Sequence, residues 1–144
     1  VSAEEMRSLG VEMMPLDELL RCSDYISVHC PLLPATHHLI GKAQFEMMKP
    51  KALLVNTSRG GVIDEKALYD ALASGRIGGA ALDVTDPEPP SADNPLLQLD
   101  NVIITPHVAA FSADFRDNFF KASVDVINDL KIGKYAGHCV NKIK

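Results

Sequence analysis

The stretch ALLVNTSRGG, residues 52–61, changes halfway along from an apolar run to a polar turn that contains glycine. A short, continuously apolar run bounded by turn residues is typical of a strand covered on both faces of its sheet. The same change recurs in AALDVTDPEPP, residues 80–90, and in VIITPH, residues 102–107. If these strands are parallel neighbours, an arginine, two carboxylates and a histidine meet at one edge of the sheet. In open α/β folds, that edge is where ligands bind.

Helical patterns separate these runs, so strand and helix alternate along the chain. We expect strands at residues 11–14, 25–30, 52–56, 79–84 and 102–105. We expect helices at residues 16–21, 42–48 and 65–74, a short helical turn at 95–98, and a last helix from 112 to 131. Asp64 is placed to cap the helix that follows it. This alternation predicts an α/β fold with a parallel sheet and right-handed connections.

The composition is that of one globular domain, with 47% hydrophobic and 23% charged residues in a chain of 144. A net charge of −5 without a lysine or arginine cluster argues against nucleic acid and anionic membrane as partners. No apolar run approaches the roughly 20 residues that span a bilayer. Cys22, Cys30 and Cys139 lack C-x-x-C spacing. This pattern favours reduced thiols in a cytoplasmic protein over a zinc site.

Arg59 lies in the turn after the apolar run at 52–56 and is followed by Gly60 and Gly61. A planar guanidinium can bind both oxygens of a carboxylate. The two glycines let the backbone turn sharply and let a ligand approach closely. An ordinary ion pair on the surface is the structural alternative for this arginine.

His107 follows a strand, and Glu88 lies among prolines in DPEPP, residues 86–90. An imidazole exchanges protons near neutral pH, which suits a general acid or base. A carboxylate held against it favours the charged imidazolium and fixes its tautomer. Taken singly, a structural histidine and an exposed loop carboxylate are the alternatives.

Asp83 is an acid inside an apolar strand, so it is either hydrogen-bonded for structural reasons or used to contact a ligand. The combination of residues favours one chemistry. An arginine for a carboxylate, a histidine for a carbonyl oxygen and a glutamate beside the histidine fit hydride reduction of a 2-oxo acid. A serine hydrolase is disfavoured because Ser58 lacks the G-x-S-x-G turn.

Several segments in order resemble the cofactor-binding part of the D-isomer-specific 2-hydroxyacid dehydrogenases. They lie between residues 16 and 141 and are VHCPLLP at 28–34, VNTSRGG at 55–61, ALDV at 81–84 with EP at 88–89, and TPH at 105–107. The family includes glyoxylate/hydroxypyruvate reductases, phosphoglycerate dehydrogenase and the C-terminal-binding-protein corepressors. The resemblance implies a partial Rossmann fold, a doubly wound parallel sheet with helices on both faces, and NAD or NADP as cofactor.

The resemblance also implies roles for single residues. Arg59 would bind the carboxylate and carbonyl of the substrate, His107 would be the acid/base, and Glu88 its paired carboxylate. Asp83 would hydrogen-bond the nicotinamide carboxamide. The implied cofactor contacts also include Cys30 on the adenosine side, Thr57 beside the nicotinamide, Ser58, Arg59, His107, Val108, Ala109 and Ala110.

The sequence departs from the family pattern at several points. The G-x-G-x-x-G turn is nowhere in the sequence, and GRIGG at 75–79 ends a helix, so it cannot cradle a pyrophosphate at a helix start. The acid that would hold the adenosine ribose is missing, and Thr85 stands where the family usually has an aromatic residue. We therefore expect residues 1–144 to be the C-terminal portion of a dinucleotide-binding domain lacking its first two strands, with the substrate domain absent from this chain.

The function expected from these observations is oxidoreduction between a nicotinamide cofactor and a small 2-hydroxy or 2-oxo acid. An NAD-sensing scaffold like the corepressors and an inactive truncated paralogue are the alternatives. We expect the isolated chain to have little or no dehydrogenase activity, an open sheet edge at residues 25–30, and a homodimer in the complete protein. A cytoplasmic location is expected, while an N-terminal targeting signal, the substrate acid, and NAD versus NADP stay open.

Overall fold

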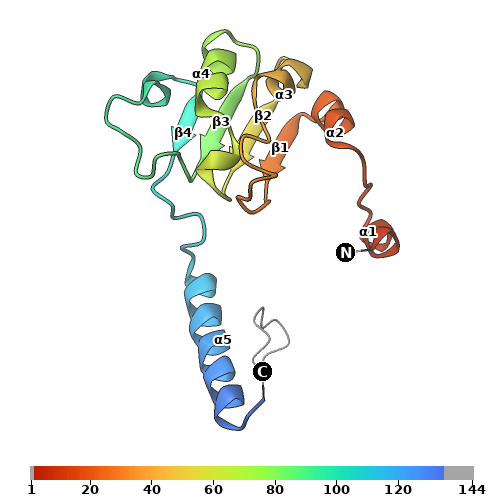
Figure 1. Ribbon diagram of the computed structural model, residues 1–144, viewed down its shortest axis with the longest axis vertical. Helices are drawn as coiled ribbons and strands as arrows, with labels where there is room; N and C mark the ends of the chain where they lie inside the picture. Colours follow the sequence, from red (N-terminus) through yellow and green to blue (C-terminus); the bar gives the residue numbers. More distant parts are fainter. Residues whose placement is uncertain (1, 135–144) are drawn as a thin grey trace. The chain divides into compact units, whose positions relative to one another are not determined.

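The computed structural model describes residues 2–134, and the chain divides into two compact units. The first unit, Val1–His107, contains the sheet, and the second, Val108–Lys144, contains one long helix (Figure 1). Of the three cysteines, Cys22 and Cys30 are free thiols, and Cys139 lies outside the described residues.

Four parallel strands form one sheet in the order β1-β2-β3-β4. They are β1 Tyr25–Val28, β2 Leu53–Asn56, β3 Gly79–Leu82 and β4 Val102–Ile104. Their last residues pair in one row, in which Val28, Asn56, Leu82 and Ile104 stand side by side. All four strands therefore end at the same edge, which confirms the predicted parallel α/β arrangement.

The helices of the first unit confirm most of the predicted positions. They are α1 Ala3–Ser8, α2 Leu16–Cys22, α3 Lys42–Met47 and α4 Glu65–Ala73, with 3-10 turns η1 Gly60–Val62 and η2 Pro95–Gln98. Asp64 caps α4 as predicted, because its carboxylate accepts a hydrogen bond from the Ala67 amide at 3.1 Å.

The strand predicted at residues 11–14 is wrong, because this segment has no regular structure. A strand needs a neighbour to bond its backbone, and an apolar pattern of four residues carries no information about a partner. Helix α1 was not predicted from the sequence. Its signals are ordinary ones: Ser2 accepts from the Glu5 amide, acidic residues lie in the first turn, and Arg7 lies in the last.

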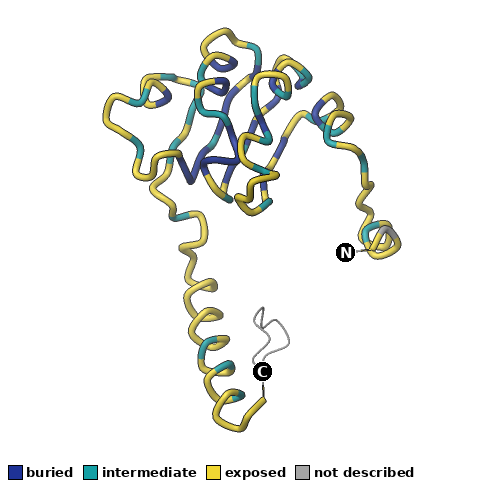
Figure 2. Tube along the Cα trace, in the orientation of Figure 1, coloured by how far each residue is buried: buried dark blue, intermediate teal, exposed yellow. Residues whose placement is uncertain are grey.

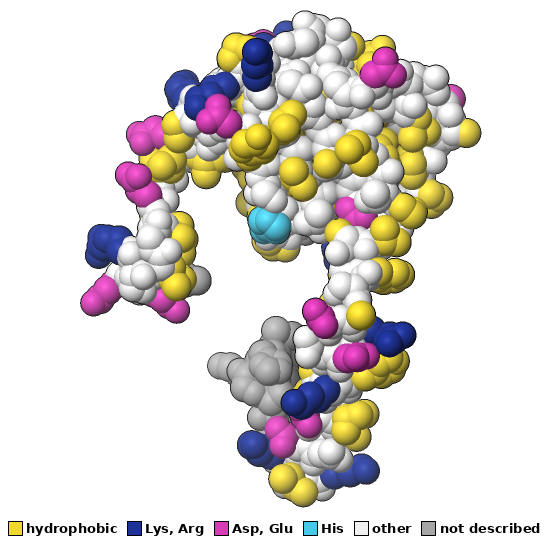
Figure 3. Space-filling model, turned by 180° about the vertical axis from the view of Figure 1, so that it is seen from behind, with side chains coloured by type: hydrophobic (Ala, Val, Ile, Leu, Met, Phe, Trp, Pro, Cys, Tyr) yellow, Lys and Arg dark blue, Asp and Glu magenta, His cyan; other side chains and the backbone are white. Residues whose placement is uncertain are grey.

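One face of the sheet holds the hydrophobic core. Side chains from this face and from α2, α3 and α4 form a single buried cluster that includes Ile26, Leu54 and Leu82 from the strands and Leu20, Phe45 and Leu68 from the helices. Figure 2 shows buried positions along the strands and along the helices that pack on them. On the opposite face Tyr25 is 77% exposed and Ile103 is 67% exposed. Figure 3 shows hydrophobic side chains on the surface of the part that contains the sheet.

The fold class is confirmed as a parallel, Rossmann-like α/β sheet, but the described residues place crossover helices on one face only. The strand order follows the chain order without a reversal. Since crossovers between parallel strands are right-handed, successive helices then fall on the same side. The expectation that both faces of the 52–56 strand are covered is therefore not met by the helices of this unit.

The second unit contains α5, Ala113–Lys131, at the position predicted for the last helix. Ser112 caps it by accepting from the Phe115 amide at 3.0 Å, and Lys131 lies in its last turn. None of its residues is buried within the described chain. No helix in residues 2–134 combines the length and apolarity needed to cross a membrane.

Candidate active site

The row of strand ends positions the predicted site residues. Arg59 follows the last residue of β2 by three positions, Asp83 follows β3 directly, and His107 follows β4 by three positions. Because the three strands are hydrogen-bonded neighbours in register, these segments leave the sheet side by side. The predicted meeting of polar residues at one sheet edge thus has its physical basis in the strand register.

His107 and Glu88 form an ion pair, with the imidazole Nδ1 and the carboxylate Oε1 2.6 Å apart. Their side chains are 50% and 39% exposed, so the pair is open to a ligand from the solvent side. The pairing uses one edge of the ring, and Nε2 lies on the opposite edge. A carboxylate at Nδ1 fixes the orientation of the ring and leaves Nε2 for a ligand.

The backbone of His107 is held in an uncommon conformation. Its φ is +55°, in the left-handed region that side chains other than glycine rarely occupy. Its amide donates to the Asp83 carbonyl at 2.9 Å, which ties the end of β4 to the end of β3. Such a conformation persists only where surrounding bonds fix it, and residues of this kind gather at functional sites.

Asp83 is buried, with 5% of its surface exposed. Its Oδ1 accepts a hydrogen bond from the Thr105 hydroxyl at 2.5 Å, and its amide donates to the Asn56 carbonyl at 2.9 Å. Asp83 also lines a hollow of about 360 Å³ together with Glu88 and His107. The two alternatives for this acid are therefore compatible, since it has a structural hydrogen bond and also faces a cavity.

That hollow brings together three of the predicted residues and adds apolar walls. Its lining comprises Asp83, Thr85, Glu88, Pro89, Pro90, Leu97, Ile104, Thr105, Pro106 and His107. Apolar walls with a few convergent polar groups are typical of a small-molecule site. Cys30, Thr57, Ser58 and Arg59 are not among the lining residues.

Arg59 is exposed in a turn that Asn56 holds in place. The Asn56 Oδ1 accepts from the Ser58 amide at 3.0 Å and from the Ser58 hydroxyl at 2.9 Å, while its Nδ2 donates to the Arg59 carbonyl at 2.9 Å. The Arg59 Nη1 donates to the Ser58 carbonyl at 2.6 Å. Asn56 is 1% exposed. No role for Asn56 was predicted from the sequence, although an amide at the end of an apolar strand indicates a hydrogen-bonded polar group.

Gly60 serves a purpose other than the one predicted. A Cβ at Gly60 would lie 2.1 Å from the carbonyl carbon and oxygen of Thr85, so the backbone of the loop after β3 occupies this space. The close approach is therefore between two segments of the chain and not with a ligand. It sets the Arg59 turn against the loop that carries Glu88. Thr85 itself is buried, and its hydroxyl donates to the Pro87 carbonyl at 3.0 Å.

The remaining predicted cofactor contacts are not among the residues that line this hollow. Cys30 is half-buried just after β1. Val108, Ala109 and Ala110 begin the second unit, where the Phe111 amide donates to the Val108 carbonyl at 2.8 Å. Within residues 2–134, no three histidine, cysteine, aspartate or glutamate side chains gather in a way that could hold a metal ion.

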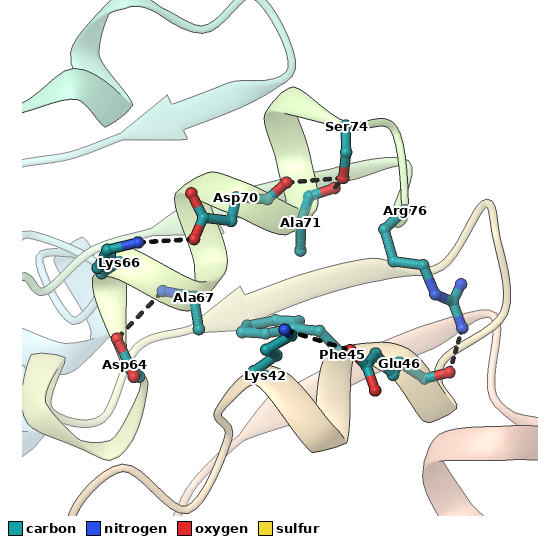
Figure 4. A pocket seen from close by; sticks show the side chains of 10 residues that line it. All are labelled: Lys42, Phe45, Glu46, Asp64, Lys66, Ala67, Asp70, Ala71, Ser74 and Arg76. Atoms are coloured by element: carbon teal, nitrogen blue, oxygen red, sulfur yellow. Dashed lines mark hydrogen bonds and ion pairs between the residues drawn. The ribbon is translucent and has the colours of Figure 1, made fainter.

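A second hollow, of about 430 Å³, lies between α3 and α4 (Figure 4). The Lys66 amine lies 2.8 Å from the Asp70 carboxylate, and this hydrogen bond raises the pKa of Lys66. The Arg76 Nη2 donates to the Glu46 carbonyl at 2.5 Å and to the Met48 carbonyl at 2.6 Å. The Arg76 bonds join the segment after α4 to the end of α3, and the Lys66–Asp70 pair lies within α4, so these polar groups of the hollow have structural partners.

Comparison with known proteins gives a family for this arrangement. Residues 1–109 match the family described as D-isomer specific 2-hydroxyacid dehydrogenase, NAD binding domain. The chain is 48% identical over 132 residues to D-3-phosphoglycerate dehydrogenase of Archaeoglobus fulgidus, covering 91% of this chain and 25% of that protein. It is 46% identical over 136 residues to glyoxylate reductase of Korarchaeum cryptofilum, covering 94% and 41%. The chain thus spans between about a quarter and two-fifths of these curated relatives.

A solved structure gives the same fold. The D-isomer specific 2-hydroxyacid dehydrogenase of Lactobacillus delbrueckii ssp. bulgaricus, in its NAD-complexed form, is similar with a TM-score of 0.86. The identity is 30%, and the match covers 98% of this chain and 46% of that one. Arg59, Glu88 and His107 all lie within the family match, whereas Ala110 lies one residue beyond it.

Proposed function

Because the chain belongs to the D-isomer specific 2-hydroxyacid dehydrogenase family, we propose that its residues catalyse hydride transfer between a nicotinamide cofactor and a small 2-oxo or 2-hydroxy acid. The observation that carries the proposal is the 2.6 Å pair between His107 and Glu88 at the edge where the parallel strands end. An NAD-sensing scaffold would use the same fold but would not require this pair to transfer a proton.

The hollow beside the pair fits a nicotinamide. Its volume of about 360 Å³ lies in the range of small-molecule pockets. The Asp83 carboxylate on its wall is an acceptor, which suits the N–H donors of a ring carboxamide. When bound, the reduced nicotinamide supplies a hydride to the carbonyl carbon of the oxo acid.

His107 then completes the reduction by moving a proton. Protonated at both ring nitrogens, it gives the Nε2 proton to the carbonyl oxygen as the carbon–oxygen π bond opens. Glu88 at Nδ1 stabilises the charged ring before the transfer and fixes its orientation throughout. In the reverse direction the neutral ring takes the hydroxyl proton back at Nε2.

Arg59 would orient the substrate. A guanidinium has five N–H donors, so the bond from Nη1 to the Ser58 carbonyl leaves capacity for both oxygens of a carboxylate. The turn that carries Arg59 lies against the Glu88 loop at Gly60, which supports a common alignment of the two groups. Positioned charge of this kind is often the largest contribution to catalysis.

We further propose that residues 1–144 form the C-terminal portion of the dinucleotide-binding domain, since the sequence has no G-x-G-x-x-G turn. The remaining cofactor contacts, at Cys30, Thr57, Ser58, Val108, Ala109 and Ala110, belong to the same proposal. The homodimer and the cytoplasmic location stay predictions.

The test is reduction of glyoxylate and hydroxypyruvate by the complete protein, followed by the oxidation of NADH or NADPH. We expect His107→Gln to lower kcat/KM by at least about a hundredfold, in the range of a lost general acid. His29→Gln is the matched control, because His29 is a solvent-exposed imidazole bonded to Ser27 at 2.8 Å. A loss below about tenfold, or about 1.4 kcal/mol, would remove His107 from the mechanism.

A further inference from the structure

The loop that carries Glu88 is held at both ends by one carboxylate, that of Glu65. The Glu65 Oε1 accepts from the Asp86 amide at 2.7 Å, and its Oε2 accepts from the Asn94 side-chain amide at 3.0 Å. Asp86 and Asn94 lie on either side of Glu88 in the sequence. Both oxygens belong to one carbon, so the two ends of the segment 86–94 are brought together like the ends of a closed loop.

This loop needs such an anchor. Between the end of β3 and the start of η2 it contains no helix or strand, and its residues from Asp86 to Pro89 are exposed. Glu88 therefore has no regular backbone bonds to fix the side chain that pairs with His107. When the two ends of such a segment are held together, less conformational entropy is lost as its middle becomes ordered.

Glu65 is itself held in place by regular structure. It is half-buried in the first turn of α4, next to Asp64, the residue that caps the helix. A second fixed point lies just before the loop, where the Thr85 backbone fills the space beside Gly60. The other end continues into η2, where the Asn94 Oδ1 accepts from the Leu96 amide at 3.0 Å.

We propose that Glu65 is a positioning residue, which holds the Glu88 loop so that the Glu88 carboxylate stays against the His107 imidazole. The inference rests on the proposed function for its catalytic meaning, because it assigns Glu65 a part in keeping the acid/base pair aligned. Glu65 contacts the loop ends and acts through Glu88.

A plain alternative is that Glu65 serves only as a negative charge at the start of a helix, where it stabilises the helix dipole. Three substitutions separate the two roles. Glu65→Asp keeps the charge at the same place but is one methylene shorter, so it cannot reach both loop ends. Glu65→Gln keeps the length but replaces one acceptor with a donor. Asp64→Asn, the control, removes one negative charge from the same helix end and keeps a good cap.

The measurements are made on the complete protein. The hydrogen-exchange rates of the backbone amides in the segment 85–94 show whether Glu65 holds the loop. In each Glu65 variant the Asp86 amide should exchange about tenfold faster, as expected when a charge-assisted hydrogen bond is lost. With glyoxylate or hydroxypyruvate, kcat should fall about 10- to 100-fold because a small misplacement of a catalytic group has this effect. KM should stay within about threefold, since Arg59 is held separately by Asn56.

The pH profile of kcat separates the two roles, because the loss of a residue with only a structural role would not change it. In both Glu65 variants it should shift toward the profile of Glu88→Gln, while Asp64→Asn keeps the unaltered profile. The inference is overturned if exchange stays at the control rate, or if exchange rises while kcat and its pH profile do not change. If the unaltered protein reduces neither acid, the proposed function fails, and the exchange rates at Asp86 still support or overturn the anchor.

Discussion

Gly60 is the position at which one added methyl group should separate the two halves of the proposed site. A Cβ there would lie 2.1 Å from the Thr85 carbonyl, whereas ordinary van der Waals contact begins at 3.4 Å. The two backbone segments must therefore separate by about 1.3 Å, the difference between these distances. Gly60 is not among the glycines with a positive φ, so the effect of Gly60→Ala is steric.

Gly60→Ala is expected to lower both the stability and the catalytic rate of the protein. Overpacking of this kind lowers the free energy of unfolding by about 1–3 kcal/mol. The displacement also moves Arg59 relative to the loop that carries Glu88, and a misplacement of about 1 Å lowers the rate about a hundredfold. Urea unfolding of the complete protein measures the first quantity, and initial rates of 2-oxo acid reduction measure the second.

Gly78→Ala is the matched control for this experiment. A Cβ at Gly78 would lie 2.8 Å from the Lys51 carbonyl oxygen, which is also a clash with backbone. Gly78 precedes the first residue of β3, at the end of the strand away from Asp83. We expect this variant to lose stability while keeping kcat/KM within about threefold. If Gly60→Ala keeps its kcat/KM as well, the close approach at Gly60 does not align the site.

Two further predictions concern side chains that hold the proposed residues. Asn56→Ala removes three hydrogen bonds to Ser58 and Arg59, so the free energy of unfolding should fall by about 2–3 kcal/mol and KM for the oxo acid should rise. Urea unfolding and steady-state kinetics measure both, and an unchanged KM would disconnect Asn56 from substrate binding. Thr105→Val removes the donor to Asp83 at nearly constant shape, so Kd for the reduced cofactor should rise about tenfold in a fluorescence titration. Ser27→Ala, which loses a hydroxyl bonded to His29, serves as its control, and equal Kd values in the two variants would contradict the role of Asp83.

The place of the candidate site could be predicted from the sequence because it depends on local patterns. Each apolar run ends in a polar turn, and helical patterns between the runs require parallel strands. The register then brings the segments after Asn56, Leu82 and Ile104 together, as the structure confirms. The pairing of Glu88 with His107 was expected from their chemistry, and the 2.6 Å distance agrees with it.

Other features depend on contacts that no local pattern contains. Glu65 lies 21 residues from Asp86 and 29 residues from Asn94, so its two hydrogen bonds could not be inferred from spacing. The use of Gly60 depends on where the loop at Thr85 runs, and that requires the folded sheet. The false strand at 11–14 shows the same limit, because a strand is defined by its neighbour as much as by its own residues.

The common row of strand ends also determines where the chain tolerates changes in length. Side chains alternate between the two faces of a strand, so one residue inserted within β3 would turn Asp83 toward the opposite face. An insertion in the turns before the strands leaves the row intact. In natural variants, insertions and deletions should therefore occur mainly at the N-terminal ends of the strands. They should be very rare in the short segments that connect the row of strand ends to the residues that follow it.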